Sequence, residues 1–384
     1  MNPIRKSHEF HHCIRGPRED VGHPDPCEER AQGYHGSSRD DKEFRDFSQK
    51  GILSGDQSVN PLAHNWNRVM VRNCDGTLFL SDAELPVRGG RPLQLRGRRN
   101  AMLAIHQLLS SGLADASELL LGGCSAGAVA APLLGDYVAQ TVRRAAAQRG
   151  GNVFVAILSD SGFFVDWSSL SRAPPGVLSF PQLQWLFEVG NVSEALPEEC
   201  LKAGESWRCM LLSSAVPYVK TPSFFLQSTV DSWQLRSLEP SSLEALQDQL
   251  RPALLRSLNA GRGRGHGGAV DHCVHHCEAW GEITWGSISN RDAFEGWYRK
   301  RLQQWHSSGF NASVFDTAGE HWPLLHLGRA GPSQCYPGQE EHLRWHQNLT
   351  LALEKCDMGR SWDIFVGNLL GKTLGDILDN NFSG

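Results

Sequence analysis

The chain has 384 residues, of which 40% are hydrophobic and 21% are charged, a composition typical of globular proteins and sufficient for one large domain or two smaller ones. Its formal net charge is −5, and its one basic run is a short Gly–Arg alternation at 261–265, so the sequence predicts no nucleic-acid partner. No apolar run reaches the roughly 18 to 20 residues that a membrane-spanning helix needs, and we expect no membrane span.

The predicted elements begin after residue 50, because residues 1–50 are polar and follow neither the strand nor the helix apolar period. We expect strands at 68–72, 119–121, 153–158 and 223–227, and helices at 98–109, 126–148, 241–258 and 362–378. The continuous apolar run at 153–158 is typical of a strand buried on both faces. Strands that alternate with helices predict an α/β fold in which catalytic residues lie just beyond the carboxyl ends of parallel strands.

The cysteines bear on the compartment in which the protein works. There are ten of them, an even number that suits disulfides in an oxidising compartment but is also compatible with free thiols. Cys200 and Cys209 close the shortest plausible loop. Four N-glycosylation sequons agree with secretion, at Asn191, Asn311, Asn348 and Asn381. We therefore expect a secreted protein, although the stretch MNPIRKSHEF lacks the apolar core of a signal peptide.

The segment GCSAG at 123–127 matches G-x-S-x-G, the nucleophile-elbow pattern. An apolar strand is predicted before it and a long Ala-rich helix after it, which places Ser125 at a helix N-terminus. There the backbone N–H of Ala126 can stabilise an oxyanion. The alternative interpretation is a Gly-Ser turn that only packs a helix onto a sheet.

A serine nucleophile needs a base that a carboxylate orients, and in this fold the three follow in the order Ser, acid, His. Asp231 lies three residues beyond the predicted strand around 223–228 and is the candidate acid. Asp160 also ends a strand, but its place one strand after Ser125 favours a turn-capping role. The base is expected in DHCVHHCEAW, where spacing alone does not choose among His272, His275 and His276.

The same cluster of histidines and cysteines could bind zinc. A zinc site of this kind needs two pairs of ligands separated by a structured loop, and no second C-x-x-C or H-x-x-H cluster supplies the other pair. The sequence therefore predicts no metal site.

Several segments, in order along the chain, resemble the pectin acetylesterase / Notum family of serine carboxylesterases: GILSGDQSVNPLAHNWNRVMVRNCDGTLF, LLLGGCSAGAVAA, ILSDSGFFVDW, TPSFFLQSTVDSWQL and HCVHHCEAW. The resemblance implies an α/β-hydrolase-like domain over 27–305, with a mostly parallel sheet and helices on both faces. It leaves 1–26 as an irregular segment, truncated or divergent and lacking N-terminal strands. It leaves 306–384 as a C-terminal extension of unknown role.

The resemblance also implies roles for individual residues. The family's G-C-S-A-G-G, whose last glycine is Ala128 here, implies that Ser125 is the nucleophile. Its D-S-W-Q implies that Asp231 is the acid, and its S-C-x-x-H-C implies that His276 is the base. Family members use no metal, so neither a metal nor another cofactor is expected.

One departure from the family bears on activity. The family carries G-G-G-W-C upstream of the C-x-x-R segment at 27–30, and those glycine amides complete the oxyanion hole. This chain has EFHHC at 9–13 instead. Because loss of one oxyanion donor costs about 10²- to 10³-fold in rate, an inactive relative that binds a carbohydrate or lipid is an alternative.

The sequence as a whole predicts a monomeric serine carboxylesterase of the extracellular space or cell wall. The expected substrate is an O-acyl ester, above all an O-acetyl ester, of a polysaccharide such as pectin, and an acylated protein is the alternative partner, as for Notum. Four tryptophans are candidates for a sugar-stacking or acyl pocket, although tryptophan is more often a core residue: Trp167, Trp185, Trp233 and Trp280.

Overall fold

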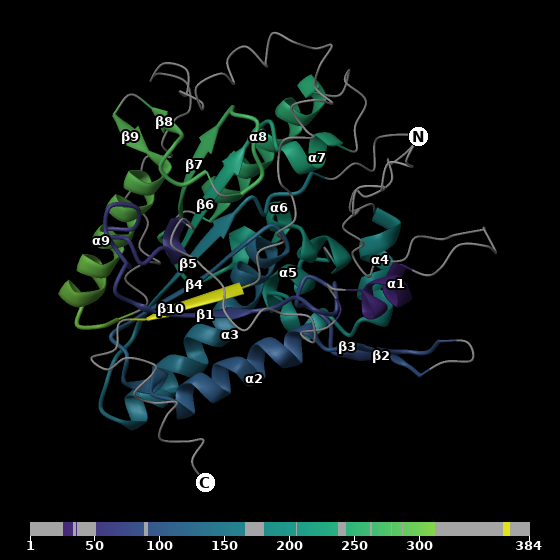
Figure 1. Cartoon of the computed structure of the whole chain (residues 1–384), viewed down its shortest axis with the longest axis horizontal. Coiled ribbons are helices and arrows are strands. Elements are labelled where there is room, and N and C mark those ends of the chain that lie inside the picture. The colour runs from purple at the N-terminus through teal and green to yellow at the C-terminus, as the bar shows by residue number, and fades with distance from the viewer. Residues whose placement is uncertain are drawn as a thin grey trace, which may run out of the picture.

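A computed structural model describes the chain over 26–33, 36, 51–87, 91–165, 180–204, 206–236, 243–261, 263–277, 279–285, 287–311 and 364–368. In this part of the chain a six-stranded sheet forms the centre of the fold (Figure 1). Its strands, in spatial order, are β1 (Asn67–Val71), β10 (Ile364–Asn368), β4 (Glu118–Cys124), β5 (Phe154–Asp160), β6 (Ser223–Ser228) and β7 (Gly267–Asp271). Strands β4 to β7 are parallel, whereas β10 is antiparallel to β1 and β4. The parallel part confirms the predicted α/β class.

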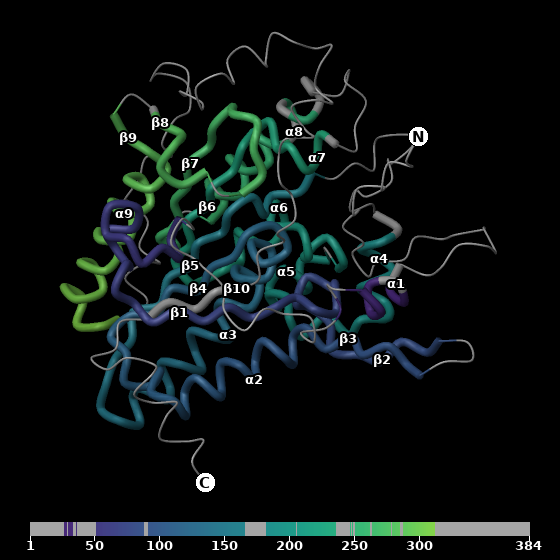
Figure 2. The backbone as a smooth tube through the Cα atoms, viewed as in Figure 1, coloured from purple at the N-terminus to yellow at the C-terminus, as the bar shows by residue number. Residues whose placement is uncertain are grey.

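Helices and short hairpins complete the described fold. The helices are α1 (Pro26–Gln32), α2 (Gly97–Ser110), α3 (Ala126–Gln148), α4 (Phe180–Val189), α5 (Glu198–Lys202), α6 (Leu212–Ala215), α7 (Ser232–Arg236), α8 (Leu243–Ala260) and α9 (Asn290–Ser307). The prediction that no regular element precedes residue 51 was wrong, because α1 lies within that polar segment. The hairpins pair β2 (Ala83–Leu85) with β3 (Leu93–Leu95) and β8 (Thr284–Trp285) with β9 (Ile288–Ser289). Figure 2 follows the backbone from β4 through α3 to β5 and on across the sheet. No helix in these ranges is both long and apolar enough to cross a membrane.

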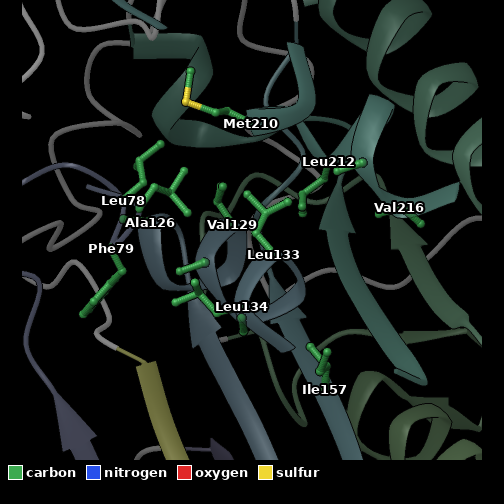
Figure 3. Close-up of a cluster of buried hydrophobic side chains, with 14 of the residues drawn as sticks. Leu78, Phe79, Ala126, Val129, Leu133, Leu134, Ile157, Met210, Leu212 and Val216 are labelled. Atoms are coloured by element: carbon green, nitrogen blue, oxygen red, sulfur yellow. The ribbon is translucent and has the colours of Figure 1, made fainter. Parts of the chain in front are cut away.

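Neighbouring residues of the central strands pack on opposite faces of the sheet. Leu119 and Leu121 of β4 belong to one large apolar cluster with α2 and α3, whereas Leu120 packs with α9 in a second cluster. Figure 3 shows the part of the first cluster that α3 provides, including Ala126, Val129, Leu133 and Leu134. Because helices cover both faces, the strands are continuous apolar runs, as the sequence predicted for 153–158.

The C-terminal prediction was wrong in one described segment. We expected a helix over 362–378, but 364–368 forms strand β10, and the remainder of that range lies outside the described residues. Strand β10 supplies backbone partners to β1 on one side and to β4 on the other. A short apolar run such as IFV cannot be assigned by its period alone, and here pairing within the sheet decides its conformation. A strand from the predicted extension 306–384 therefore lies within the main sheet.

Candidate active site

Ser125 lies in a sharp turn between the end of β4 and the start of α3. Its backbone has φ 56° and ψ −115°, a strained conformation for a residue other than glycine, and its N–H donates to the Asp160 carbonyl at 3.0 Å. A Cβ added to Gly123 would overlap the backbone of Gly127, so close packing requires the first glycine of the pattern. The predicted strand, turn and helix are thus all present, with Ala126 as the first residue of α3.

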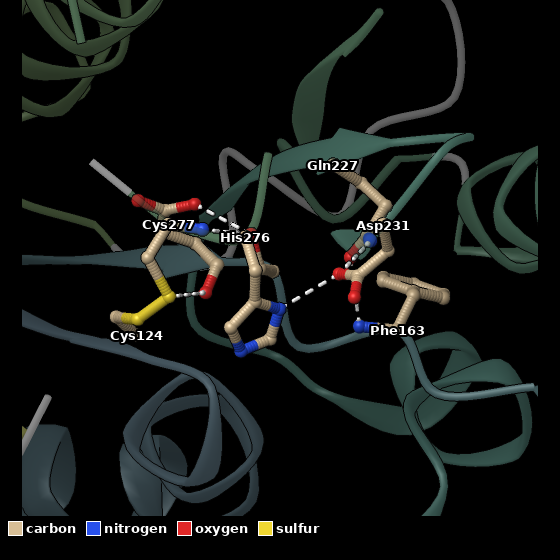
Figure 4. The surroundings of a disulfide bond; sticks show 8 residues. Cys124, Phe163, Gln227, Asp231, His276 and Cys277 are labelled. Carbon is tan, nitrogen blue, oxygen red and sulfur yellow. Dashed lines mark hydrogen bonds and ion pairs between the residues drawn. A yellow bond between two sulfur atoms is a disulfide. The ribbon is translucent and has the colours of Figure 1, made fainter. Parts of the chain in front are cut away.

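Asp231 and His276 meet beyond the carboxyl ends of β6 and β7. The Nδ1 atom of His276 lies 2.8 Å from Oδ2 of Asp231, which is fully buried (Figure 4). An ionised carboxylate can only accept, so a neutral imidazole bonded to it donates from Nδ1 and keeps Nε2 as an acceptor. That Nε2 atom is buried and has no hydrogen-bond partner among the described residues. His276 therefore has the orientation and the free nitrogen that a general base needs.

Two buried glutamines fix the carboxylate of Asp231. Gln227 donates from Nε2 to Oδ2 at 3.2 Å, and the N–H of Gln234 donates to Oδ1 at 2.9 Å. The same glutamines accept the N–H groups of Phe163 and Val165, each at 3.0 Å. These bonds hold the acid and attach the loop after β5 to it.

A disulfide joins Cys124, which precedes Ser125, to Cys277, which follows His276, with a Cα–Cα distance of 5.8 Å. Figure 4 shows the imidazole of His276 between this disulfide and Asp231. The nucleophile and base candidates are therefore neighbours of residues that are covalently joined. The disulfide Cys200–Cys209 confirms the predicted short loop.

Each of the three candidate histidines has a different partner. Nδ1 of His272 lies 2.6 Å from the hydroxyl of Thr229, and His276 faces Asp231. Nε2 of His275 lies 3.0 Å from both carboxylate oxygens of Asp271. The structure thus distinguishes the histidines, which the spacing in the sequence could not do.

A possible metal-ligand group among the described residues consists of Cys124, His276 and Cys277, whose ligand atoms lie within 4.8 Å of one another. The two sulfurs are bonded to each other, so neither is the thiolate that zinc requires.

The pair Asp271 and His275 was not singled out in the sequence, although the D-x-x-x-H spacing was visible there. Burial lowers the pKa of His275, but the charge of Asp271 and its hydrogen bond outweigh burial, and the net pKa is raised. The His275 carbonyl accepts from the N–H of Ser232 at 3.0 Å. This pair therefore fixes the loop beside Asp231.

Of the four candidate tryptophans, Trp233 lies at the site. The Trp233 ring stacks on the His276 ring, with centroids 5.9 Å apart and an interplanar angle of 28°. The centroid of the Phe164 ring lies 5.2 Å from that of Trp233. Trp280 is buried in the cluster with α9, Trp185 packs against two other apolar clusters, and Trp167 lies outside the described residues.

Asp160 supports turns, because its backbone carbonyl accepts from the N–H of Ser125 and its carboxylate accepts from the Ser161 hydroxyl at 3.0 Å.

Comparison with known proteins shows the family of the chain. The family model for pectinacetylesterase matches residues 21–323. The chain belongs to the pectinacetylesterase family. Pectin acetylesterase 5 of Arabidopsis thaliana is 29% identical over 290 residues, covering 69% of this chain and 64% of that relative. Pectin acetylesterase 11 of the same plant is 30% identical over 283 residues, covering 67% of this chain and 68% of that relative.

Members of the Notum branch are also similar. The palmitoleoyl-protein carboxylesterase NOTUM of Mus musculus is 28% identical over 197 residues, covering 48% of this chain and 37% of that relative. The solved structure of the Wnt deacylase Notum from Drosophila superposes with a TM-score of 0.60 at 25% identity, covering 72% of this chain and 81% of that chain. These similarities confirm the α/β-hydrolase-like fold. The chain spans about two thirds of the length of the plant relatives.

Proposed function

We propose that this chain is a serine carboxylesterase that hydrolyses O-acyl esters, with an O-acetylated polysaccharide such as pectin as its substrate. The observation that carries the proposal is the 2.8 Å contact between His276 and Asp231, with Nε2 of His276 unpartnered among the described residues. The disulfide that joins the neighbours of Ser125 and His276 supports it. Family membership and the names of the plant relatives support the reaction class and the substrate.

In the proposed mechanism, Oγ of Ser125 attacks the ester carbonyl carbon while Nε2 of His276 takes its proton. Asp231 stabilises the imidazolium, and the N–H of Ala126 stabilises the oxyanion of the tetrahedral intermediate. The intermediate then expels the alcohol, which takes the proton from His276. Water attacks the resulting acyl-enzyme with His276 as the base, and the acid leaves.

The oxyanion hole decides between an active esterase and an inactive binding relative. The N–H of Ala126 is one donor at the end of β4, and residues 9–13, where the family carries its glycine-rich loop, lie outside the described residues. Because each donor is worth about 10²- to 10³-fold in rate, we expect a correspondingly low turnover number if no second donor is present.

We also propose that the protein acts as a monomer in an oxidising, extracellular place such as the cell wall. Two disulfides between described residues, Cys124–Cys277 and Cys200–Cys209, support this location, since such bonds persist outside reducing compartments.

The proposal is tested with purified protein and the variant Ser125→Ala. We expect the wild type to release acetate from acetylated pectin and to react with a fluorophosphonate probe, and Ser125→Ala to do neither. A palmitoleoylated peptide, offered in parallel, tests the Notum-like alternative. Equal hydrolysis by variant and wild type would contradict the role of Ser125, and an unlabelled, folded wild type would favour the inactive relative.

A further inference from the structure

The loop that carries His276 has to cross the sheet to reach Ser125. Ser125 follows β4 and His276 follows β7, and the order β4-β5-β6-β7 places two strands between them. Three strand spacings correspond to about 14 Å. Cys277, next to His276, therefore meets Cys124, next to Ser125, because the loop at 272–277 extends over the ends of β6 and β5.

Successive contacts fix this loop to each strand end in turn. At the end of β6, Asp231 accepts from His276, and the His275 carbonyl accepts from Ser232. At the end of β5, the hydroxyl of Ser161 accepts from the Cys277 N–H at 2.9 Å. At the end of β4 the connection is covalent, through the Cys124–Cys277 disulfide. This bond completes the crossing at the place where the nucleophile lies.

The backbone on both sides of the disulfide is strained. Cys277 has φ 66° and Ser125 has φ 56°, both in the left-handed region that favours glycine. Such conformations persist only where the surroundings hold them. Since Nε2 of His276 has no hydrogen-bond partner among the described residues, no bond from that nitrogen to the Ser125 hydroxyl fixes their separation. The crosslink, which is buried at both ends, holds the two backbone segments instead.

We infer that Cys124 and Cys277 are positioning residues, whose disulfide holds Ser125 and His276 at the separation needed for proton transfer. The inference rests on the proposed function and extends it, because it makes competence of the site depend on one disulfide. Reduction by an external dithiol breaks the S–S bond. The two protein sulfurs take up two electrons and two protons to become thiols, and the reductant becomes a disulfide. The loop then retains its contacts with β6 and β5 but loses its covalent bond to β4.

The test compares two double variants by the rate at which a fluorophosphonate labels Ser125. Cys124→Ser/Cys277→Ser removes this crosslink, and Cys200→Ser/Cys209→Ser is the matched control, because it removes a buried disulfide of the same chain elsewhere. Displacement of a catalytic group by about 1 Å can cost about 100-fold, so we expect labelling and kcat to fall about 100-fold in the first variant with little change in KM. The control should label at the wild-type rate. Assays run below both melting temperatures, and circular dichroism verifies folding.

A second measurement uses the wild-type protein, in case the first variant fails to fold. The protein is titrated with dithiothreitol in the presence of a chelator, because the reduced cysteines and His276 lie close enough to bind a metal ion. Alkylation and mass spectrometry identify which disulfide opens. Activity should fall in step with reduction of Cys124–Cys277 and return on reoxidation.

The outcomes separate the two proposals. A folded Cys124→Ser/Cys277→Ser variant that is labelled within about threefold of the wild-type rate would overturn the positioning role and leave the proposed function standing. An equal fall in the labelling rate of Cys200→Ser/Cys209→Ser would do the same. Retention of activity after the Cys124–Cys277 bond has been reduced would do the same. A wild type that does not label at all would overturn the proposed function and this inference together.

Discussion

Replacing Asp231 by asparagine tests the proposed role of Asp231 as the acid that orients the proton on His276. Oδ2 of Asp231 accepts from Nδ1 of His276 at 2.8 Å and from Nε2 of Gln227 at 3.2 Å, and Oδ1 accepts from the N–H of Gln234 at 2.9 Å. An amide offers one oxygen and one NH₂ group, so in either orientation its NH₂ faces a donor. If the oxygen faces Gln234, the NH₂ faces His276 and requires Nδ1 to be unprotonated, which moves the ring proton to Nε2.

The expected loss of activity follows from these two orientations. A ring protonated at Nε2 cannot accept the Ser125 proton, and the same substitution in a serine protease lowers kcat by about 10⁴-fold, or about 5.5 kcal/mol. The other orientation retains the useful tautomer but leaves the buried N–H of Gln234 facing a donor, at a cost of about 1–3 kcal/mol. In both orientations the substitution also removes the negative charge that would stabilise the imidazolium. We therefore expect kcat to fall by roughly 10³- to 10⁴-fold.

The assay is the initial rate of 4-nitrophenol release from p-nitrophenyl acetate, normalised to folded protein. The control is Asp271→Asn, which alters the adjacent Asp–His pair and should lower stability while reducing kcat by less than about tenfold. An Asp231→Asn protein within about tenfold of the wild-type rate would refute the assigned role, as would an equal loss in Asp271→Asn.

Three further changes test a histidine at the opposite end of the sheet and two residues beside the site. Burial lowers the pKa of His266 to about 4 from an ordinary 6.5, so between pH 6.5 and about pH 4 the unfolded chain takes up the proton in preference to the folded one. The free energy of unfolding should therefore fall by about 3 kcal/mol as the pH drops from 6.5 to 4, and His266→Gln should make this fall smaller. Urea unfolding at several pH values measures both falls. Gly123→Ala should lower the free energy of unfolding by about 1–3 kcal/mol and abolish fluorophosphonate labelling, because the added Cβ would overlap the backbone of Gly127. Thermal melting and the labelling rate measure the two effects. Trp233→Leu removes the ring stacked on His276 and should lower kcat up to about tenfold without a matching rise in KM, as steady-state kinetics will test.

Strands β4, β5 and β6 and helices α2, α3 and α8 could be predicted from their apolar runs and periods, whereas β7 and the 18-residue helix α9 were missed. The helix predicted at 126–148 coincides with α3, and the run at 153–158 lies almost entirely within β5. Strand β10 could not be predicted in this way. Its five residues carry no decisive period, and its conformation depends on pairing with β1 and β4, which lie far from it in the sequence.

The candidate site could be predicted in part. The pattern around Ser125 indicated a turn, and the end of β6 indicated Asp231, but the choice of His276 depended on a family resemblance rather than on spacing. The side-chain bond from Gln227 to Asp231 could not be foreseen, since a glutamine can donate or accept in many environments. The bond from the backbone N–H of Gln234 is a local one, typical of an aspartate that precedes a helix.

The Cys124–Cys277 disulfide could not be predicted from the sequence either. The strand order alone would argue against this pairing, because the ends of β4 and β7 lie about 14 Å apart. It forms because the loop after β7 folds back over two strand ends, a path defined by contacts with Asp231 and Ser161. The contacts that bring His276 to its acid also bring Cys277 to Cys124. The same loop path therefore accounts for both the contact of His276 with Asp231 and the disulfide beside Ser125.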